Sequence, residues 1–289
     1  KYEGMSIPDL RLKFGLERPY FSWISQIEAK RKYARKFGPL FEKKWLFPVG
    51  LPLEQSSSYA TAWFKATLVT TPYSIDLCAG MGIDSDALSQ RKGLKQHWAN
   101  ELNPDLAKLL QHNLAASKLS NAPAEELFEA IEAWQQALSI DPTDLTIYVD
   151  PDRRARGNKA HSIKYTVPNL PSLQGKWLEC AHTLVSKHSP MASVEELRQL
   201  RGCAAIYVLE FLGECKELLC VQRKDWVAAP EIHAVVILEK KEVRLFTSSP
   251  ISPAVAYTDL IQTLYKLYTN PIIYMMTVHR RAKADGYWL

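Results

Sequence analysis

The 289 residues suffice for one large α/β domain or for a core domain with appendages, and a hydrophobic fraction of 47% argues against a largely disordered chain. The net charge of +5 is compatible with a polyanionic partner but does not require one. Five cysteines without a CxxC spacing argue against a disulfide framework and against a zinc ribbon. Because the sequence has no apolar run of about 18 residues and no secretory signal, we expect a cytoplasmic protein that uses neither membrane nor metal.

The first 70 residues predict a helical region. Residues 21–37 carry apolar side chains at helical spacing among polar ones, and no stretch of this region alternates convincingly as a strand would. A segment with prolines and a glycine follows. Ser56 to Ser58 then offer N-caps for a helix that begins near Tyr59.

The pattern changes near residue 73, where residues 74–117 predict strand, loop, helix, strand and helix, a βαβ unit. Further short, β-branched runs predict strands at 145–150, 182–188, 204–211 and 233–239. The last of these forms a predicted antiparallel hairpin with residues 243–249, at the edge of a mainly parallel sheet. We therefore divide the chain into a helical region (1–70), an α/β domain (71–250) and a C-terminal appendage (251–289), in which residues 257–271 suggest one amphipathic helix.

The loop after the first predicted strand is the strongest indication of a ligand. The strand ends at Asp76 and leads into Gly80 and Gly82, where a ligand can approach the backbone closely. Glu101 ends the second strand 19 residues after Gly82, and its carboxylate can accept hydrogen bonds from both hydroxyls of an adenosine ribose. An isolated glycine pair would favour a simple tight turn, but the ordered set of strand, acid, glycines, helix and second acid favours a nucleotide-like cofactor.

Two details favour S-adenosylmethionine (SAM) over a dinucleotide. Ser85 stands where the dinucleotide fingerprint requires a third glycine, and the carboxylate of Asp76 suits a cationic amine and sulfonium but would repel a pyrophosphate. We interpret Cys78 as a packed thiol rather than a nucleophile. The candidate cofactor-binding residues are Asp76, Cys78, Gly80, Gly82, Asp84 and Glu101.

The acceptor of the methyl group is expected at the end of the fourth strand, because α/β sheets bind ligands at the carboxyl ends of their strands. Asp150 can accept a hydrogen bond from an acceptor amine, Pro151 stiffens the turn, and Arg153 and Arg154 can grip phosphates. These residues could instead form a polar, salt-bridged loop. His161 and His188 could remove a proton, although direct displacement at a methyl carbon needs no strong base and a lone histidine is more often structural.

The stretch from Asp76 to Gly82 resembles the first motif of class I SAM-dependent methyltransferases. Longer segments at 51–66, 148–154, 185–191 and 213–219 are similar to bacterial methyltransferases that carry a THUMP-like C-terminal domain. The resemblance implies a Rossmann-like fold with a mostly parallel seven-stranded sheet, SAM as the cofactor and an RNA substrate. The THUMP-like domain itself is not recognisable after residue 250.

The sequence departs from the family pattern in two places. In class I methyltransferases an Asn or Asp at the position of Asp150 is often followed by two prolines and an aromatic residue. Here Asp152 and Arg153 replace the second proline and the aromatic residue. A flipped base would therefore have to stack elsewhere, for example on Tyr165 or on the N-terminal helices. No strand with a trailing acid is evident around residues 121–126, which leaves Glu125 a weak candidate near the adenine. Methylation of a uridine carbon is disfavoured because no cysteine nucleophile follows the next strand.

A basic segment near the N-terminus supports an RNA partner. Seven lysines and arginines lie between residues 30 and 44, among them Lys30, Arg31, Lys32, Arg35 and Lys36, although a solvated helix face would look the same. We therefore predict methyl transfer to an RNA base nitrogen, with Asp150, Pro151 and Arg153 as catalytic candidates. The alternatives are a methyltransferase for protein or a small molecule, and a non-catalytic RNA-binding module.

Overall fold

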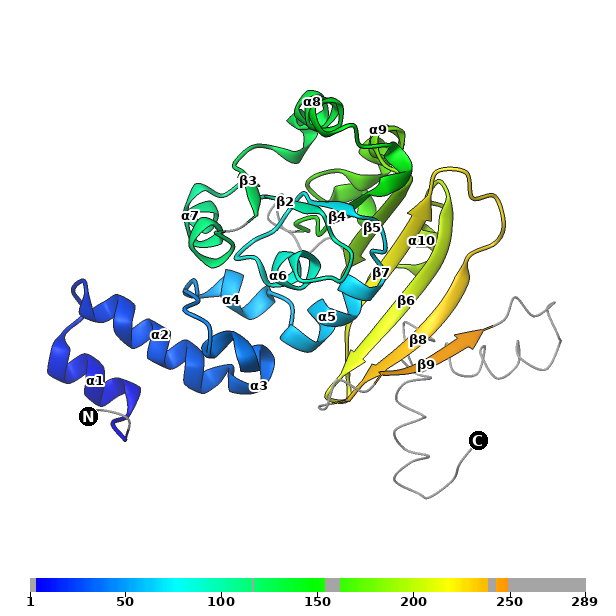
Figure 1. The fold of residues 1–289 in the computed structure, drawn as a ribbon. Coiled ribbons are helices and arrows are strands. Elements are labelled where there is room, and N and C mark those ends of the chain that lie inside the picture. Colours follow the sequence, from blue (N-terminus) through cyan, green and yellow to red (C-terminus); the bar gives the residue numbers. More distant parts are fainter. Residues whose placement is uncertain (1–3, 116, 154–161, 239–242, 249–289) are drawn as a thin grey trace, which may run out of the picture.

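The computed structural model describes residues 4–115, 117–153, 162–238 and 243–248 (Figure 1). Its helices are α1 (Ile7–Phe14), α2 (Tyr20–Lys32), α3 (Ala34–Phe37), α4 (Leu51–Gln55), α5 (Tyr59–Thr67), α6 (Ile83–Ser89), α7 (Pro104–Asn113), α8 (Phe128–Leu138), α9 (Leu170–Cys180) and α10 (Val194–Arg198). Its strands are β1 (Tyr73–Asp76), β2 (Gln96–Asn100), β3 (Lys118–Ser120), β4 (Leu145–Val149), β5 (Thr183–His188), β6 (Cys203–Phe211), β7 (Glu214–Arg223), β8 (Glu231–Ile237) and β9 (Val243–Ser248).

The strands form one mixed sheet in the order β3-β2-β1-β4-β5-β7-β6-β8-β9. The five strands from β3 to β5 are parallel to one another, β7 is antiparallel to both β5 and β6, and β8 is parallel to β6. The chain order reverses between β1 and β4, so their carboxyl ends flank a topological switch point, where α/β sheets bind ligands.

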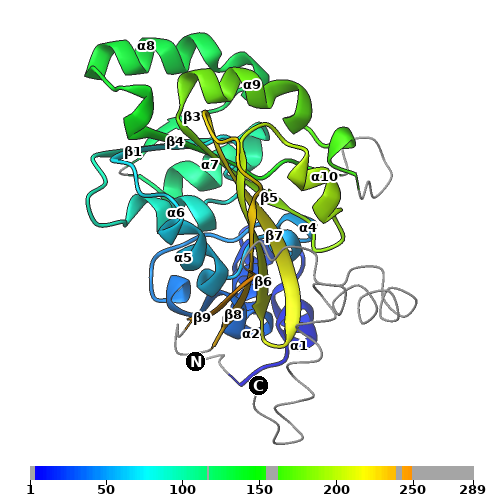
Figure 2. The same cartoon turned by 90° about the vertical axis from the view of Figure 1, so that its right-hand side faces the viewer.

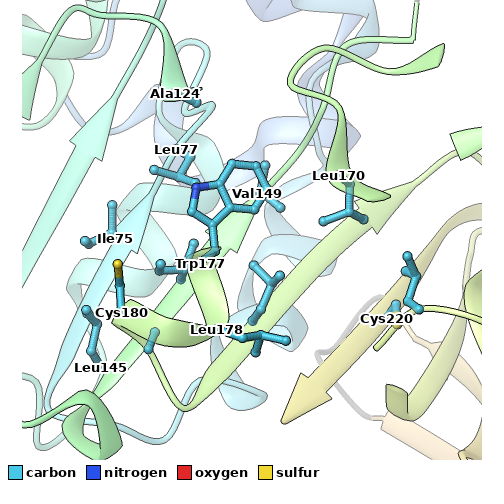
Figure 3. Packing of buried hydrophobic residues seen from close by; sticks show 14 of the residues in the cluster. Ile75, Leu77, Ala124, Leu145, Val149, Leu170, Trp177, Leu178, Cys180 and Cys220 are labelled. Carbon is cyan, nitrogen blue, oxygen red and sulfur yellow. The ribbon is translucent and has the colours of Figure 1, made fainter. Parts of the chain in front are cut away.

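Alternate residues of the central strands face two different hydrophobic cores. Ile75 and Ile147 belong to a cluster with buried residues of α8, α9 and α10. Figure 3 shows Trp177 of α9 within this cluster, close to Leu77 and Val149. Tyr148 and Val185 face the opposite side, where α5, α6 and α7 cover the sheet. Figure 2 shows α5 and α6 on one side of the long strands and α10 on the other. Because both faces are covered, successive residues of β1 and β4 are buried instead of alternating with exposed ones.

The N-terminal helices pack on the sheet domain and also extend beyond it. Phe37 and Leu40 are fully buried in the same hydrophobic cluster as Met81 of the glycine loop and Leu110 of α7. In Figure 1, α1 and α2 form a pair that lies away from the sheet. The inner part of the helical region is thus joined to the α/β domain through one core, while its outer part extends from it.

The fold confirms the predicted Rossmann-like βαβ unit and the hairpin of β8 and β9. The prediction of a mostly parallel sheet of seven strands is wrong in its count, because β8 and β9 extend the sheet to nine strands within the described residues. Three of the eight pairings among these strands are antiparallel. Ser58 caps α5 as expected, by accepting a hydrogen bond from the Thr61 amide. The predicted helix over residues 21–37 is interrupted at Tyr33.

Two strands were missed by the sequence patterns. β3 has only three residues, all partly exposed, so no alternation can reveal it. β7 begins with Glu214, Lys216 and Glu217, whose charges hide its apolar continuation.

The predicted helix at 257–271 and the rest of the C-terminal appendage lie outside the described residues. Among those described, none of the helices combines the length and apolar character that crossing a bilayer requires.

Candidate active site

One large cavity, of about 1530 Å³, opens at the carboxyl ends of the parallel strands. Cys78, Glu101 and Asp150, which follow β1, β2 and β4, line it together with His188 at the end of β5. Its opposite wall is built from α3, α4 and the beginning of β7. The switch point of the sheet and the N-terminal helical region therefore enclose the same space.

Asp76 shapes the glycine loop from behind. Its side chain is completely buried, and its carboxylate accepts hydrogen bonds from the Cys78 amide (3.1 Å) and the Ser85 hydroxyl (2.6 Å). Burial raises the pKa of Asp76 to about 8, an effect that the hydrogen bond from Ser85 partly offsets. Asp76 is not among the described residues that line the cavity, so here it holds the loop rather than presenting a surface to a ligand.

The two glycines of the loop have different surroundings. Gly80 has a φ of +59° and lines the cavity, and a Cβ atom added there would meet nothing within 4 Å. Gly82 has a φ of +100°, and an added Cβ atom would lie 2.8 Å from Cδ1 of Leu110. Gly80 thus leaves room for a ligand, whereas Gly82 is required for close packing of α7 against the start of α6.

Glu101 closes the cavity beside the glycine loop, where the sequence predicts a cofactor. Its two carboxylate oxygens accept hydrogen bonds from the amides of Gly80 (2.7 Å) and Asn103 (2.8 Å), which fixes the side chain beside the glycine loop. Burial raises the pKa of Glu101, while these amides oppose the rise. A carboxylate oxygen has lone pairs for further donors, so Glu101 can still accept hydrogen bonds from ribose hydroxyls.

Several carboxylates lie close enough together to raise the pKa of their neighbours. The pKa of the Cys78 thiol is raised well above its ordinary value, first by burial and then by the charges of Asp76, Asp150 and Glu101. A thiol held protonated in this way is a poor nucleophile, which agrees with the interpretation of Cys78 as a packed residue. This side of the cavity favours a cationic ligand over an anionic one.

Asp150 lines the cavity at the end of β4, where the sequence predicts the methyl acceptor. Its carboxylate accepts a hydrogen bond from Lys187 Nζ at 2.5 Å, while about a third of the side chain stays exposed. Burial raises the pKa of Asp150, and Lys187 opposes this rise. Pro151 and Arg153 also line the cavity, and Arg153 donates a hydrogen bond to the Ser189 hydroxyl.

Behind Asp150 lies a buried charge network that the sequence analysis did not find. Lys65 of α5 is fully buried and contacts Asp84 at 2.7 Å and Glu217 at 3.0 Å. Tyr148 also donates a hydrogen bond to Asp84 (2.8 Å), so Asp84 is bound on several sides although it touches the cavity. In the sequence, each of these charged residues lies in a largely apolar helix or strand. That pattern does not show that their side chains contact one another.

The basic N-terminal segment faces the cavity. Arg31, Lys32, Arg35 and Lys36 line it, and Tyr33 lies among them. Burial lowers the pKa of Lys36 to about 8, and the neighbouring charges of Lys187 and Lys216 act in the same direction. The exposed side chain of Lys30 is not part of the described cavity wall. Most of the predicted basic segment therefore lines the same cavity as Asp150.

The remaining predicted residues contribute less. Tyr165 is half exposed and is not among the described cavity-lining residues, so Tyr33 is the better placed aromatic. His188 is buried against the Ser186 hydroxyl (2.8 Å), and burial lowers its pKa to about 3, so it is neutral at physiological pH. Glu125 lines the cavity beside Ala124. Arg154 and His161 lie outside the described residues.

The order of the strands, the glycine loop and the cavity at the switch point define a Rossmann-like α/β fold of the kind found in solved methyltransferase structures. One such structure is the "putative methyltransferase" from Porphyromonas gingivalis W83, which matches with a TM-score of 0.67 and 25% identity over 88% of this chain and 66% of that one. The chain thus spans just under two thirds of that protein. No family model and no curated protein matches.

Two further structures match at lower TM-scores. The "putative RNA methyltransferase PH1948" from Pyrococcus horikoshii has a TM-score of 0.41 and 17% identity, over 66% of this chain and 97% of that one. The O-methyltransferase from Bacillus cereus in complex with SAH has a TM-score of 0.36 and 13% identity, over 55% of this chain and 74% of that one. Matches at this level carry no further weight.

Proposed function

We propose that this protein is a methyltransferase that uses SAM and modifies RNA. The observation that carries the proposal is a single cavity with two unlike walls. Carboxylates gather on the sheet side around the glycine loop, and cations outnumber the carboxylate of Glu54, the partner of Lys32, on the described helical side. A cationic cofactor suits the first wall and a polyanionic substrate suits the second.

The residues around the glycine loop fit the cofactor. Gly80 leaves space where a side chain would protrude, and Glu101 offers carboxylate oxygens to the ribose hydroxyls. When bound, SAM supplies a methyl group on a positively charged sulfur. The buried Asp76 would act indirectly, by holding the loop through Cys78 and Ser85.

The helical wall supports RNA as the acceptor molecule. Arg31, Lys32 and Arg35 are exposed at the rim of the cavity, and Arg153 lies at its acceptor end. Arginine and lysine side chains in this arrangement can follow a phosphate backbone while one nucleotide enters the cavity. A methyltransferase for a protein or a small molecule would not need this basic rim.

Calorimetric titration with SAM tests the cofactor. We expect saturable SAM binding, no comparable binding of NAD, and at least tenfold weaker SAM binding by Glu101→Gln. Glu126→Gln is the matched control, because Glu126 is exposed and is not among the described residues that line the cavity. Wild-type protein that does not bind SAM would refute the proposal.

Incubation with labelled SAM and total RNA from a deletion strain tests the acceptor. Label in RNA supports the proposal, and label in protein or small molecules would favour the first alternative. Intact SAM and RNA binding without any transfer would instead indicate a non-catalytic RNA-binding module.

A further inference from the structure

A chain of charges of alternating sign, buried except at its Asp150 end, connects the cofactor loop with the acceptor end of the cavity. It runs from Asp84 to Lys65 (2.7 Å), on to Glu217 (3.0 Å), then to Lys187 (4.0 Å) and finally to Asp150 (2.5 Å). These five residues come from α6, α5, β7, β5 and the turn after β4, elements that are far apart in the sequence. Lys187 and Asp150 are the members that meet at the acceptor side.

This arrangement is costly for the fold. The side chain of Lys65 is fully buried, and those of Glu217 and Lys187 are only 6% and 12% exposed. Apolar residues of similar volume often stabilise a protein interior as well as a buried ion pair does. Because stability alone does not account for the network, we look for its effect in the cavity. There it holds the Lys187 ammonium against Asp150.

The charge states of the pair follow from their contacts. Burial alone would lower the pKa of Lys187, but the charges of Asp150 and Glu217 outweigh it and raise that pKa, so Lys187 stays protonated. The same contact opposes the rise in the pKa of Asp150 that burial causes. The cavity thus presents a cationic donor and a carboxylate acceptor within 2.5 Å of each other.

A hydroxyl group matches this pair better than a base nitrogen does. Its proton can be donated to Asp150 while its oxygen accepts a hydrogen bond from Lys187. A neutral base nitrogen would acquire positive charge as it takes up a methyl group, and the adjacent ammonium would disfavour that charge. An oxygen that loses its proton becomes more negative before attack, and the same ammonium stabilises it.

We propose that the methylated atom is a hydroxyl oxygen, the ribose 2′-hydroxyl of RNA, with Asp150 and Lys187 as the catalytic pair. This inference rests on the proposed function and departs from the base nitrogen that the sequence analysis predicts. The 2′-hydroxyl is the hydroxyl group that distinguishes RNA from DNA.

The transfer balances without any further reactant. The hydroxyl oxygen forms a bond to the methyl carbon as the carbon–sulfur bond breaks, and the electron pair of that bond stays on sulfur, which becomes a neutral thioether. The hydroxyl proton passes to the Asp150 carboxylate and then to water, which reaches this partly exposed side chain. Lys187 keeps its proton throughout and stabilises charge on the oxygen. Glu217 and Lys65 are positioning residues, because Glu217 contacts Lys187 and Lys65 in turn holds Glu217.

Product analysis with the wild-type protein decides the methylated atom. Total RNA from a deletion strain is incubated with tritium-labelled SAM and then hydrolysed in alkali, which requires a free 2′-hydroxyl next to each cleaved phosphodiester. Label in alkali-resistant dinucleotides is the expected result. Label in methylated bases would overturn this inference and leave the proposed function intact, whereas the absence of label from all RNA would overturn both.

Variants test the catalytic pair. We expect Lys187→Met to lower kcat about 10²- to 10³-fold, as removal of one stabilising donor does, with the Kd for SAM unchanged within about twofold. The rate of this variant should also require a higher pH, because Asp150 then lacks the cation that favours its charged form. Lys187→Arg should keep part of the activity, and Lys224→Met, outside the described cavity wall, should keep all of it. A merely structural Lys187 would instead change SAM affinity and thermal stability without moving the pH profile.

Discussion

The carboxyl group of Asp76 sits between the end of β1 and α6, where its hydrogen-bond partners are the Cys78 amide and the Ser85 hydroxyl. The sequence identified Asp76 as a residue that would face a cationic cofactor. The structure gives it a supporting position instead, because its side chain is completely buried. A residue's chemistry can thus be read from a motif, but whether the side chain reaches the ligand depends on what packs over it.

The raised pKa of Asp76 predicts a pH dependence of stability. Since its pKa is about 8 when folded against an ordinary value of 3.8, the folded state binds the additional proton between these values. The free energy of unfolding should therefore fall as pH rises through this range, by up to about 1.4 kcal/mol per pH unit from this group, and level off above pH 8. Asp76→Asn, which mimics the protonated acid, should have a flatter profile of Tm from pH 5 to pH 9. Identical slopes for the two proteins would contradict this assignment.

The two glycines of the loop predict different substitution effects. Gly82→Ala should destabilise the protein by about 2–4 kcal/mol, because the backbone has a positive φ and the new Cβ would clash with Leu110. Gly80→Ala has the backbone penalty alone, about 1 kcal/mol, but should weaken SAM binding because it fills the cavity. Urea unfolding and calorimetry measure the two effects. Equal decreases in stability would show that the packing against α7 is unimportant.

At the scale of elements, α2 and α3 turn a run of charges into a wall of the cavity. The helix is interrupted at Tyr33, and cations of both α2 and α3 line the cavity. Composition alone could not separate this arrangement from a solvated helix face. The burial of Phe37 and Leu40 against the sheet domain fixes the orientation of these helices, and so places the cations at the cavity.

The basic wall predicts salt-dependent RNA binding. Replacing Arg31, Lys32 and Arg35 together by alanine should weaken RNA binding and reduce the slope of log K against log salt by about 0.7 for each phosphate that these side chains neutralise. SAM affinity should stay the same. The control variant replaces Lys92, Lys95 and Lys108, three exposed lysines that are not among the described cavity-lining residues. Filter binding at several salt concentrations measures both variants, and an equal effect in the control would indicate nonspecific attraction.

At the scale of the whole molecule, the inner helices and the glycine loop share a hydrophobic cluster, so the cavity depends on both parts of the chain. Phe37 is fully buried in this cluster with Met81 of the loop. We therefore expect the helical region from α3 onward and the sheet domain to unfold together.

Phe37→Ala tests this coupling. It should destabilise the protein by about 3–5 kcal/mol and lower a single thermal transition seen alike by near-UV and far-UV circular dichroism. Phe21→Ala, at a more exposed position of α2, should cost less than about 1 kcal/mol. Two separate transitions would show that the helical region folds independently.

The sequence by itself determined the βαβ unit, the glycine loop, the two acids that end β1 and follow β2, and the acidic turn after β4. These features are local, because period, turn residues and spacing along the chain specify them. It did not reveal β3 or β7, which are too short or too charged at their start for a pattern to show.

Only the tertiary structure decided what surrounds these motifs. It placed Asp76 behind the loop, brought the basic helices over the cavity, and assembled Lys65, Lys187 and Glu217 beside Asp150. The ion pairs among Lys65, Lys187, Glu217 and Asp150 join residues 30 or more positions apart in the sequence. No local pattern encodes them, because they arise from the order in which the strands pair and from the packing of helices across the sheet.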